Sequence, residues 1–475
     1  MRFGLVLRNF VAGVIIVLLM NRSTLLARLP HLLTLVLGAI FGGSLVFITP
    51  PFGVPDELAH FNRIYHCSQG KVYACRRDSQ CGDDLPASLN AIYQAIAGDA
   101  RQDEEFCVSR DKIRQALAIP LDPAQQQYST FENTALYSPV PYLPAAAAVG
   151  IGRVAEMRPL GLLYLGRIAN LIAYLALAVA AVRLIPVQKW TLALVALMPM
   201  SMFLAASLSA DAVTLGLALM TIALALDLAL GEEAPAGRLA AFGLCLVLLA
   251  LSKQAYVSLA LLFFIIPAGK FAGRGQWLTA AVLFLGLPLA ANLAWAYSVR
   301  SLYVPMLPFV DPPQQIAWIG LHPWSYAAAM FKAVYHLDTY LGMIGLFGWL
   351  GAHLSKTVCL VYWMTLAATA FLDGGKPLPL AARTRAILLG IYVTAASVVS
   401  TIVYLSWERV GIKSIEGIQP RYFLPLLPLV LLPFRGSSKL VSHRFLRLAV
   451  PLLAMLGAMV AAAATWKTMA MRYYW

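Results

Sequence analysis

Two carboxylates and an imidazole follow the first long apolar segment of the chain. That segment ends at a proline pair, and Asp56, Glu57 and His60 come shortly after it. Carboxylates in the first turn of a helix meet the positive end of the helix dipole, and Pro55 suits the first helical position. Positioned carboxylates also serve as general bases in catalysis. The group is therefore either an ordinary helix start or a set of candidate catalytic residues at a membrane surface.

The composition predicts an all-α polytopic membrane protein. Of the 475 residues, 60% are hydrophobic and 12% are charged, which is more apolar surface than one soluble core could bury. The net charge of +14 does not indicate a nucleic-acid partner, because the basic residues lie in short connections between apolar segments. That distribution is typical of cytoplasmic loops, where lysine and arginine set the orientation of a membrane protein.

The same charge rule predicts a topology for one membrane domain that covers residues 1–475. The first segment, Leu32–Ile48, should run outward from the cytoplasm, and residues 50–137 should form a large extracytoplasmic loop. Ser138–Ile151, interrupted by three prolines, is expected to be a surface helix. The pattern leaves the topology of residues 1–20 and 324–354 open. The total is about eleven transmembrane helices, whose other members are Leu160–Val182, Trp190–Ala206, Ala212–Leu230, Leu239–Leu251, Tyr256–Pro267, Trp277–Tyr297, Val358–Phe371, Ala386–Leu405, Tyr422–Phe434 and Leu448–Thr465.

The predicted outer loop is acidic and rich in cysteine. Of the 22 acidic residues, 12 fall between Asp56 and Glu132. Four cysteines in one polar segment suit an oxidising compartment and could form two disulfides, with three connectivities open. A zinc site is the alternative, although the loop contains no CxxC pair. The four cysteines are Cys67, Cys75, Cys81 and Cys107.

Four polar groups far apart in sequence should face the outer side of the membrane together. Ionisable residues at the ends of spans are costly to bury, so they are functional candidates by default. Each also has an ordinary explanation: a helix cap for Asp211, a snorkelling side chain for Lys253 and an interface anchor for Arg421. Two acids and two bases on one face could bind an anion and move a proton. The groups are Asp56 with Glu57 and His60, then Asp211, then Lys253 with Gln254, then Gln419 with Arg421 and Tyr422.

These motifs resemble a family of bacterial membrane proteins that is placed in the GT-C glycosyltransferase superfamily. The resemblance covers most of the chain. The order of one span, an acidic outer loop and a proline-led surface helix is also similar to that of aminoarabinose transferases and protein mannosyltransferases. The chain departs from many relatives in having Pro420 before Arg421, and Tyr137 with Ser138 where some transferases carry a basic residue. The motifs that carry the resemblance are VPDELAH from Val54 to His60, SADA from Ser209, LSKQAY from Leu251 and QPRYFLP from Gln419.

The resemblance implies a transfer of sugar from a polyprenyl-phosphate carrier, such as an undecaprenyl lipid, to an acceptor hydroxyl outside the cytoplasm. Asp56 would act as the general base with Glu57 beside it, and inversion at the anomeric carbon is expected. Lys253 and Arg421 would stabilise charge on the departing phosphate. A magnesium or manganese ion at Asp56 and Asp211 stays open, since oxygen ligands suit these ions. The remaining candidate substrate-binding residues are His60, Gln254, Gln419, Tyr422 and Tyr137, the last as a ring that stacks on sugars.

The implied location is the bacterial inner membrane, with the active site on the periplasmic side and a role in surface polysaccharide, such as O-antigen, synthesis or modification. The partners would be a polyprenyl-linked sugar, a glycan or lipid-linked acceptor and the surrounding lipids. A lipid or polysaccharide transporter is the main alternative, but it should place charge near the middle of its spans. A scaffold protein is a weaker alternative, because it would not need the Asp56 group. The identities of the sugar and the acceptor, and the oligomeric state, do not follow from the sequence.

Overall fold

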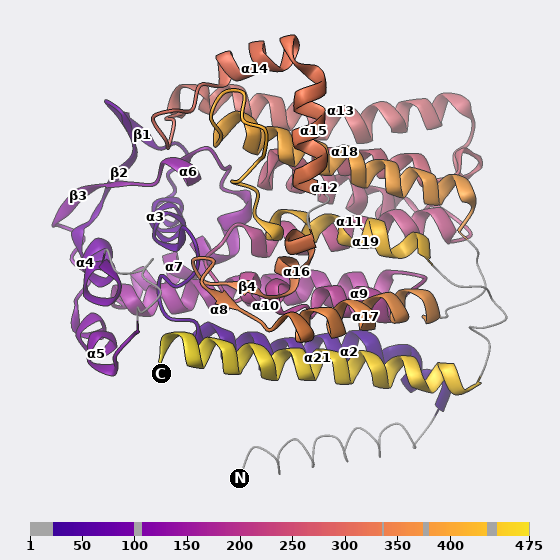
Figure 1. Ribbon diagram of the computed structural model, residues 1–475, viewed down its shortest axis with the longest axis horizontal. Helices are drawn as coiled ribbons and strands as arrows, with labels where there is room; N and C mark the ends of the chain where they lie inside the picture. Colours follow the sequence, from indigo (N-terminus) through magenta and orange to yellow (C-terminus); the bar gives the residue numbers. More distant parts are fainter. Residues whose placement is uncertain (1–21, 99–106, 335–336, 374–379, 435–443, 475) are drawn as a thin grey trace.

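Long apolar helices lie side by side along the long axis of the molecule (Figure 1). The computed structural model describes residues 22–98, 107–334, 337–373, 380–434 and 444–474, so the predictions for residues 1–20 lie outside it. Six helices among the described residues are long and apolar enough to cross a membrane. The prediction of a mostly helical membrane protein is therefore confirmed. The six are α2 (Arg22–Ile48), α8 (Pro159–Leu184), α11 (Asp211–Leu230), α13 (Arg274–Val299), α18 (Ala382–Ser406) and α21 (Arg444–Tyr473).

Several shorter apolar helices pack among the long ones. A 3-10 turn, η2 (Val140–Tyr142), leads into α7 (Leu143–Val154), which agrees with the short proline-led helix predicted there. These elements fall within or close to predicted segments, but their lengths do not settle how many cross, so the count of eleven stays a prediction. The others are α12 (Ala236–Ser252), η3 (Gln254–Ile265), α17 (Lys356–Leu372) and a run of η6 (Pro420–Leu426), α19 (Leu427–Leu431) and η7 (Leu432–Phe434).

The transmembrane helix predicted over Trp190–Ala206 is not one continuous helix. Residues 190–206 form two helices, α9 (Lys189–Ala196) and α10 (Pro199–Ala205), in which every residue except Lys189 is buried. Pro199 has no N–H to continue the first helix, and its fixed backbone angle suits the start of the second. Asp373, just after α17, accepts hydrogen bonds from the backbone N–H groups of Trp190 and Thr191 and so holds the start of α9.

The outer loop is folded, which corrects the purely helical prediction. It contains a three-stranded antiparallel sheet in the order β1-β2-β3. The last pair of the β1-β2 ladder is Arg77 with Gln80, and a two-residue turn joins the strands there. Asp78 in that turn has a φ of 52°, and such hairpin turns require a positive φ. The loop elements are α3 (Glu57–Ser68), β1 (Cys75–Arg77), β2 (Gln80–Pro86), α4 (Ala87–Ile96), α5 (Arg110–Ala118), β3 (Gln126–Thr130) and α6 (Glu132–Ala135).

The predicted disulfides are not formed in this structure. Cys67, Cys75, Cys81 and Cys107 are all free thiols. Cys75 lies opposite Gly82 and Cys81 lies opposite Arg76, so the two cysteines project from opposite faces of the β1-β2 pair. A bridge between them would require a change of strand register.

The segment of uncertain topology, residues 324–354, makes two helices and a small hairpin. The hairpin strands pair Leu346 with His353 and Phe347 with Ala352. Its loop returns to the outer loop, because Trp349 Nε1 donates to the carbonyl of Phe52 at 3.1 Å. The two helices are α15 (Pro323–Val334) and α16 (Leu337–Gly345), and the hairpin strands are β4 (Leu346–Phe347) and β5 (Ala352–His353). Earlier in the chain lie two 3-10 turns, η4 (Ala268–Lys270) and η5 (Arg300–Leu302), and the helix α14 (Pro312–Leu321).

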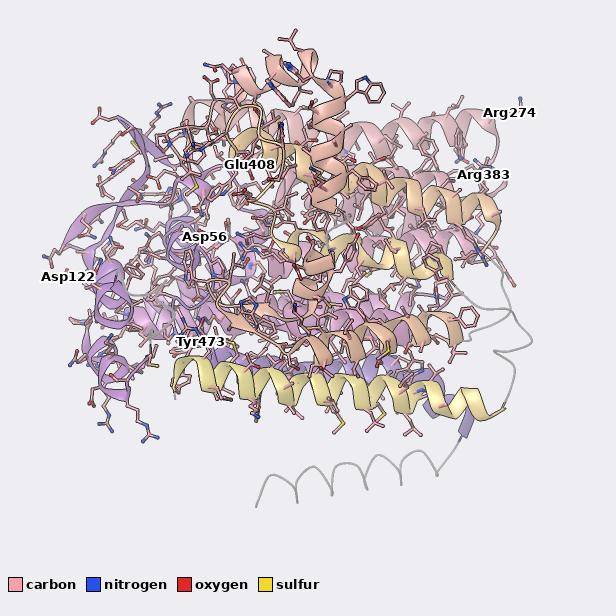
Figure 2. The ribbon with its side chains drawn as sticks, viewed as in Figure 1. Asp56, Asp122, Arg274, Arg383, Glu408 and Tyr473 are labelled. Carbon is pink, nitrogen blue, oxygen red and sulfur yellow. The ribbon has the colours of Figure 1, made fainter. Side chains whose placement is uncertain are left out.

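The two ends of the bundle differ in charge. Figure 2 places Asp56 and Asp122 toward one end of the molecule and Arg274 and Arg383 at the opposite end. A bundle of apolar helices with one strongly basic end has the asymmetry that orients membrane proteins. The folded outer loop lies at the end opposite these arginines (Figure 1).

We expect thiol labelling to distinguish the two ends. In a variant with Cys75 and Cys107 changed to serine, Asp122→Cys should react with a membrane-impermeant maleimide in intact spheroplasts. Arg274→Cys should react only after permeabilisation, because the positive-inside rule predicts that the basic end faces the cytoplasm. Both positions are exposed, so unequal accessibility within the fold cannot cause the difference. Labelling of both cysteines in intact spheroplasts would contradict this orientation.

Candidate functional site

A fully buried ion pair joins the outer loop to the helix bundle. Arg167 of α8 and Glu57 at the start of α3 are each 0% exposed in their side chains. Arg167 Nε donates to Glu57 Oε1 at 2.8 Å, and Nη2 donates to Oε2 at 2.5 Å. Glu57 also accepts hydrogen bonds from the backbone N–H groups of Phe52 at 2.8 Å and Leu208 at 3.3 Å. One carboxylate therefore fixes the outer loop, α8 and the turn before α11 together.

Arg167 uses its remaining donors on the end of α2. Its Nη groups donate to the carbonyls of Val46, Thr49 and Pro50 at 2.8 to 2.9 Å. These carbonyls lie where the proline pair ends the helix, so α2 offers them no further backbone donors. All five N–H donors of the guanidinium thus have acceptors. Glu57, predicted as a catalytic residue, is instead a structural anchor with no capacity left for a substrate.

Asp56 differs sharply from its neighbour Glu57. It does not lie in a first helical turn as predicted, because α3 begins at Glu57 and Asp56 precedes it in the left-handed conformation, with φ of 62°. Aspartate tolerates this region better than most residues, but the conformation still persists only where the surroundings enforce it. The anchored Glu57 supplies that enforcement. The Asp56 side chain keeps 34% of its surface exposed.

Two carboxylates and two cations form one ionic network, and they come from four distant segments of the chain. Arg421 Nη2 lies 3.8 Å from Asp56 Oδ2, and Arg421 Nε lies 3.7 Å from Asp211 Oδ2. Lys253 Nζ pairs with the other oxygen of Asp211. Asp211, Lys253 and Arg421 are 10 to 13% exposed, so Asp56 is the most open member of the network. The structure brings these four predicted residues together.

The local backbone positions Asp211, Lys253 and Arg421, the three less exposed members of the ionic network. Asp211 is the first residue of α11 and not its cap, and its backbone N–H donates a hydrogen bond to the hydroxyl oxygen of Ser209 at 3.0 Å. Lys253 lies in extended conformation between α12 and η3. Arg421 falls in the first turn of η6, after Pro420. All three therefore stand at the ends of apolar helices, where a charged side chain can reach a polar surface.

Aromatic rings flank the ammonium group of Lys253. The ring centroids of Tyr422 and Tyr137 lie 5.4 Å and 5.8 Å from Lys253 Nζ, within reach of cation–π attraction. Tyr256 donates its hydroxyl to the carbonyl of Tyr422 at 2.8 Å and so fixes that part of the backbone. Tyr137 and Tyr422, both half-buried, therefore flank the cation of the network.

His60 lies behind the network and is held neutral. Its Nδ1 makes a hydrogen bond of 2.9 Å with the hydroxyl of Tyr142, and the residue is 7% exposed. Burial lowers the pKa of His60 from its usual 6.5 to about 3, and the cations Lys253 and Arg421 act in the same direction against Asp211. A neutral imidazole at this place cannot bind an anion through charge.

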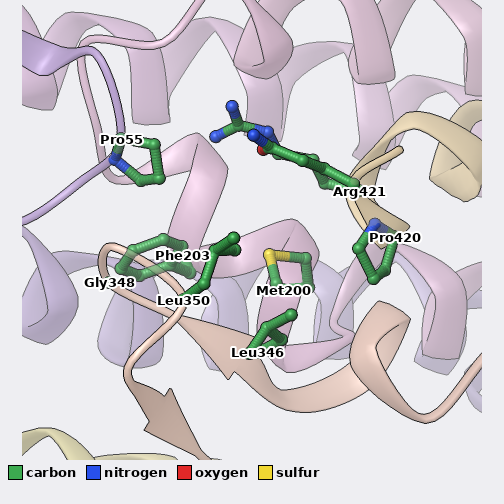
Figure 3. Close-up of a pocket in the computed structure, with 9 residues that line it drawn as sticks. Pro55, Met200, Phe203, Leu346, Gly348, Leu350, Pro420 and Arg421 are labelled. Atoms are coloured by element: carbon green, nitrogen blue, oxygen red, sulfur yellow. The ribbon is translucent and has the colours of Figure 1, made fainter. Parts of the chain in front are cut away.

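The two predicted glutamines differ in their surroundings. Gln254 has an exposed side chain, and its backbone carbonyl accepts a hydrogen bond from Asn292 at 3.1 Å. No contact between that side chain and the ionic network is found in the described chain. Gln419, in contrast, lines a pocket beside Arg421. Figure 3 shows Arg421 extending toward Pro55 above the apolar side chains of this pocket.

The residue set does not fit a divalent metal ion. Within the described residues, no group of three or more histidine, cysteine or acidic side chains is placed to share an ion. Asp56 and Asp211, the proposed ligands, are bridged by the guanidinium of Arg421. A metal at that place would meet two cations, so its binding would require Arg421 to leave.

Two buried arginines of this region were not predicted as site residues. Arg167 is a charged residue inside the apolar segment Leu160–Val182, and the rarity of such a charge was the available sequence signal. Arg63 of α3 is fully buried and donates to Nδ1 of His66 and to the carbonyls of Val72 and Tyr137. It thereby positions the backbone of Tyr137. Its place in an ordinary amphipathic loop helix gave no sequence signal.

Comparison with known proteins places the chain among membrane proteins. Residues 39–430 match the family described as "Predicted membrane protein (DUF2142)". The match contains the outer loop, the ionic network and the pocket. No match was found among curated proteins or solved structures.

Breaking the buried pair should destabilise the protein strongly. Glu57→Gln leaves Arg167 without its counter-charge in a fully buried site, so we expect a loss of about 3 to 5 kcal/mol in unfolding free energy. Asp56→Asn is the matched control, with the same chemical change one residue away at a partly exposed ion pair, and should cost at most about 1 kcal/mol. Denaturant unfolding in detergent measures both. Equal losses for the two variants would contradict the structural role of Glu57.

Acid should destabilise the protein partly through His60. Between pH 6.5 and about 3 the unfolded chain binds a proton at this residue and the folded chain does not, so the unfolding free energy falls as pH falls. From pH 7 to pH 5 this residue should account for about 2 kcal/mol. His60→Gln should be less sensitive to that change than the wild type, as measured by denaturant unfolding at the two pH values. Parallel losses in both proteins would show that His60 is not buried as a neutral group.

Proposed function

We propose that this chain, which belongs to the DUF2142 family of predicted membrane proteins, is a glycosyltransferase that uses a polyprenyl-phosphate sugar. It transfers the sugar to a hydroxyl of a glycan or lipid-linked acceptor on the outer side of a bacterial inner membrane. The resemblance of the four motifs to GT-C enzymes supports the reaction class. The folded outer loop, opposite the basic end of the bundle, supports the side of the membrane.

The observation that carries the proposal is the difference in pairing and exposure between the two carboxylates of the ionic network. Asp211 is paired with Lys253 and faces Arg421, so its charge is largely balanced inside the protein. Asp56 has one cation, at 3.8 Å, and a side chain that is 34% exposed. An open carboxylate beside buried cations matches a reaction that must remove a proton and stabilise a departing anion.

The transfer step uses these groups in complementary roles. The acceptor hydroxyl oxygen attacks the anomeric carbon while its proton moves to a carboxylate oxygen of Asp56. The bond between that carbon and the phosphate oxygen breaks, and its electron pair leaves with the polyprenyl phosphate. Arg421 and Lys253 stabilise the negative charge that accumulates on this leaving group. Attack opposite the phosphate inverts the anomeric centre, and no step depends on a metal ion.

The alternative of lipid or polysaccharide transport has less support from the charged groups. The buried cation Arg167 has all its donors engaged by Glu57 and by backbone carbonyls, so it offers no free charge to a passing substrate. Asp227 pairs with Arg238 at 3.0 Å, and both side chains are partly exposed. Neither group forms the midplane polar site that a transporter of this kind requires.

Transfer assays on purified protein test the proposal. A panel of radiolabelled polyprenyl-phosphate sugars is incubated with candidate glycan and lipid-linked acceptors. Asp56→Asn should lower the transfer rate by about 10² to 10⁴, the usual contribution of a positioned base, with the thermal melting temperature nearly unchanged. The same substitution at an exposed outer-loop carboxylate, Asp122→Asn, should leave transfer intact. Normal transfer by Asp56→Asn would contradict the assigned role, and sugar-lipid flipping without transfer would favour a transporter.

A further inference from the structure

A pocket lies next to the ionic network and mixes apolar walls with a polar edge. Its walls include Met200 and Phe203 of α10 and Leu346 of β4. Gln419 and Arg421, on either side of Pro420, form the polar edge. Figure 3 shows the labelled side chains of Met200, Leu346 and Phe203 below Arg421. A ligand in this pocket would touch hydrocarbon on one side and two polar groups on the other.

The polar edge carries two atoms that are buried and unpaired. Gln419 Oε1 and Arg421 Nε each have almost no exposed surface and no hydrogen-bond partner within the described ranges of the chain. The nearest anionic atom to that Nε is Asp211 Oδ2 at 3.7 Å, which is too long for a hydrogen bond. Buried polar atoms are normally paired, since an unpaired one costs free energy. Both residues line the pocket, so a polar group bound there would supply the missing partners.

The backbone that presents these atoms is fixed. Tyr422 N–H donates to the carbonyl of Gln419 at 3.0 Å, and the carbonyl of Tyr422 accepts the hydroxyl of Tyr256 at 2.8 Å. Pro420 packs so closely on α16 that a methyl group added at Gly342 would lie 2.7 Å from its ring. The backbone from which both side chains extend is therefore held in place, which limits the ordering that a ligand would have to impose.

We infer that Gln419 Oε1 and Arg421 Nε form a subsite for one hydroxyl group of the transferred sugar, which makes Gln419 a specificity-determining residue. A hydroxyl donates one hydrogen bond and accepts another, so it can satisfy both atoms together. A phosphate dianion has only acceptors and would face the glutamine oxygen unfavourably. The space between these residues is small, which suits one hydroxyl group and not a whole sugar ring. This inference rests on the proposed function, because it assigns the hydroxyl to the sugar whose phosphate Arg421 and Lys253 bind.

The expected consequence is strong rejection of one deoxy sugar. A site built to bind a hydroxyl discriminates against the analogue that lacks it, because its buried polar atoms then stay unpaired. For a sugar that the wild-type protein uses, one monodeoxy analogue should lose at least about 10²-fold in kcat/KM. In Gln419→Leu the preference should fall to less than about tenfold, because the acceptor half of the subsite is gone.

The test has a transfer arm and a binding arm. The transfer arm compares polyprenyl-phosphate sugars with their monodeoxy analogues. The binding arm measures thermal stabilisation by methyl glycosides of glucose, galactose, mannose and arabinose and by their monodeoxy forms, which needs no turnover. Both arms use the wild type, Gln419→Leu and Gln419→Glu, and the last should keep the preference because a carboxylate still accepts from the hydroxyl. Gln314→Leu, the same substitution at an exposed glutamine of α14, is the matched control and should behave as wild type.

The outcomes separate this inference from the proposed function. Binding that depends on one hydroxyl and on Gln419, without transfer from any donor, would support the subsite and overturn the transferase. Transfer with equal preference in the wild type and Gln419→Leu would overturn the subsite and leave the transferase standing. Absence of both transfer preference and glycoside binding in the wild type would overturn the subsite. A preference that weakens equally in Gln314→Leu would also overturn it, since the effect would not be specific to the pocket.

Discussion

The arrangement of this protein depends on one buried ion pair between Arg167 and Glu57. Taking both charges out of water is costly, and the cost is met only because every donor of the guanidinium and both oxygens of the carboxylate are engaged. The partners are the end of α2, the start of α3, α8 and the turn before α11. The pair thus fixes the long outer loop to the helix bundle.

This attachment explains the backbone conformation and the exposure of Asp56. Because Glu57 is anchored, Asp56 is held in the left-handed conformation and its side chain stays partly exposed near Arg421. Asp211 and Lys253 balance each other at the same surface, where the ends of three apolar helices meet. The network therefore combines low exposure, which strengthens electrostatic effects, with one carboxylate that a reactant can approach.

Much of the fold follows from local sequence signals, and the convergence of the ionic residues follows from the charge rule. Apolar length and basic connections predicted the long helices, and their alternation placed Asp56, Asp211, Lys253 and Arg421 on one side. The roles of individual residues did not follow, because they depend on distant partners. Glu57 is defined by Arg167, 110 residues away, and His60 by Tyr142, 82 residues away. The break at Pro199 shows in addition that a proline inside an apolar run can divide a predicted helix.

The most direct measurement of the central claim is an electron cryo-microscopy structure of the purified protein with a bound polyprenyl-phosphate sugar. The claim is that Asp56, Arg421 and Lys253 share one substrate site at the outer end of the bundle. The predicted result is a phosphate within hydrogen-bond reach of Arg421 and Lys253, with the anomeric carbon facing the side from which Asp56 can deprotonate an acceptor. A phosphate bound elsewhere, or Asp56 separated from Arg421 by protein or by membrane depth, would contradict it.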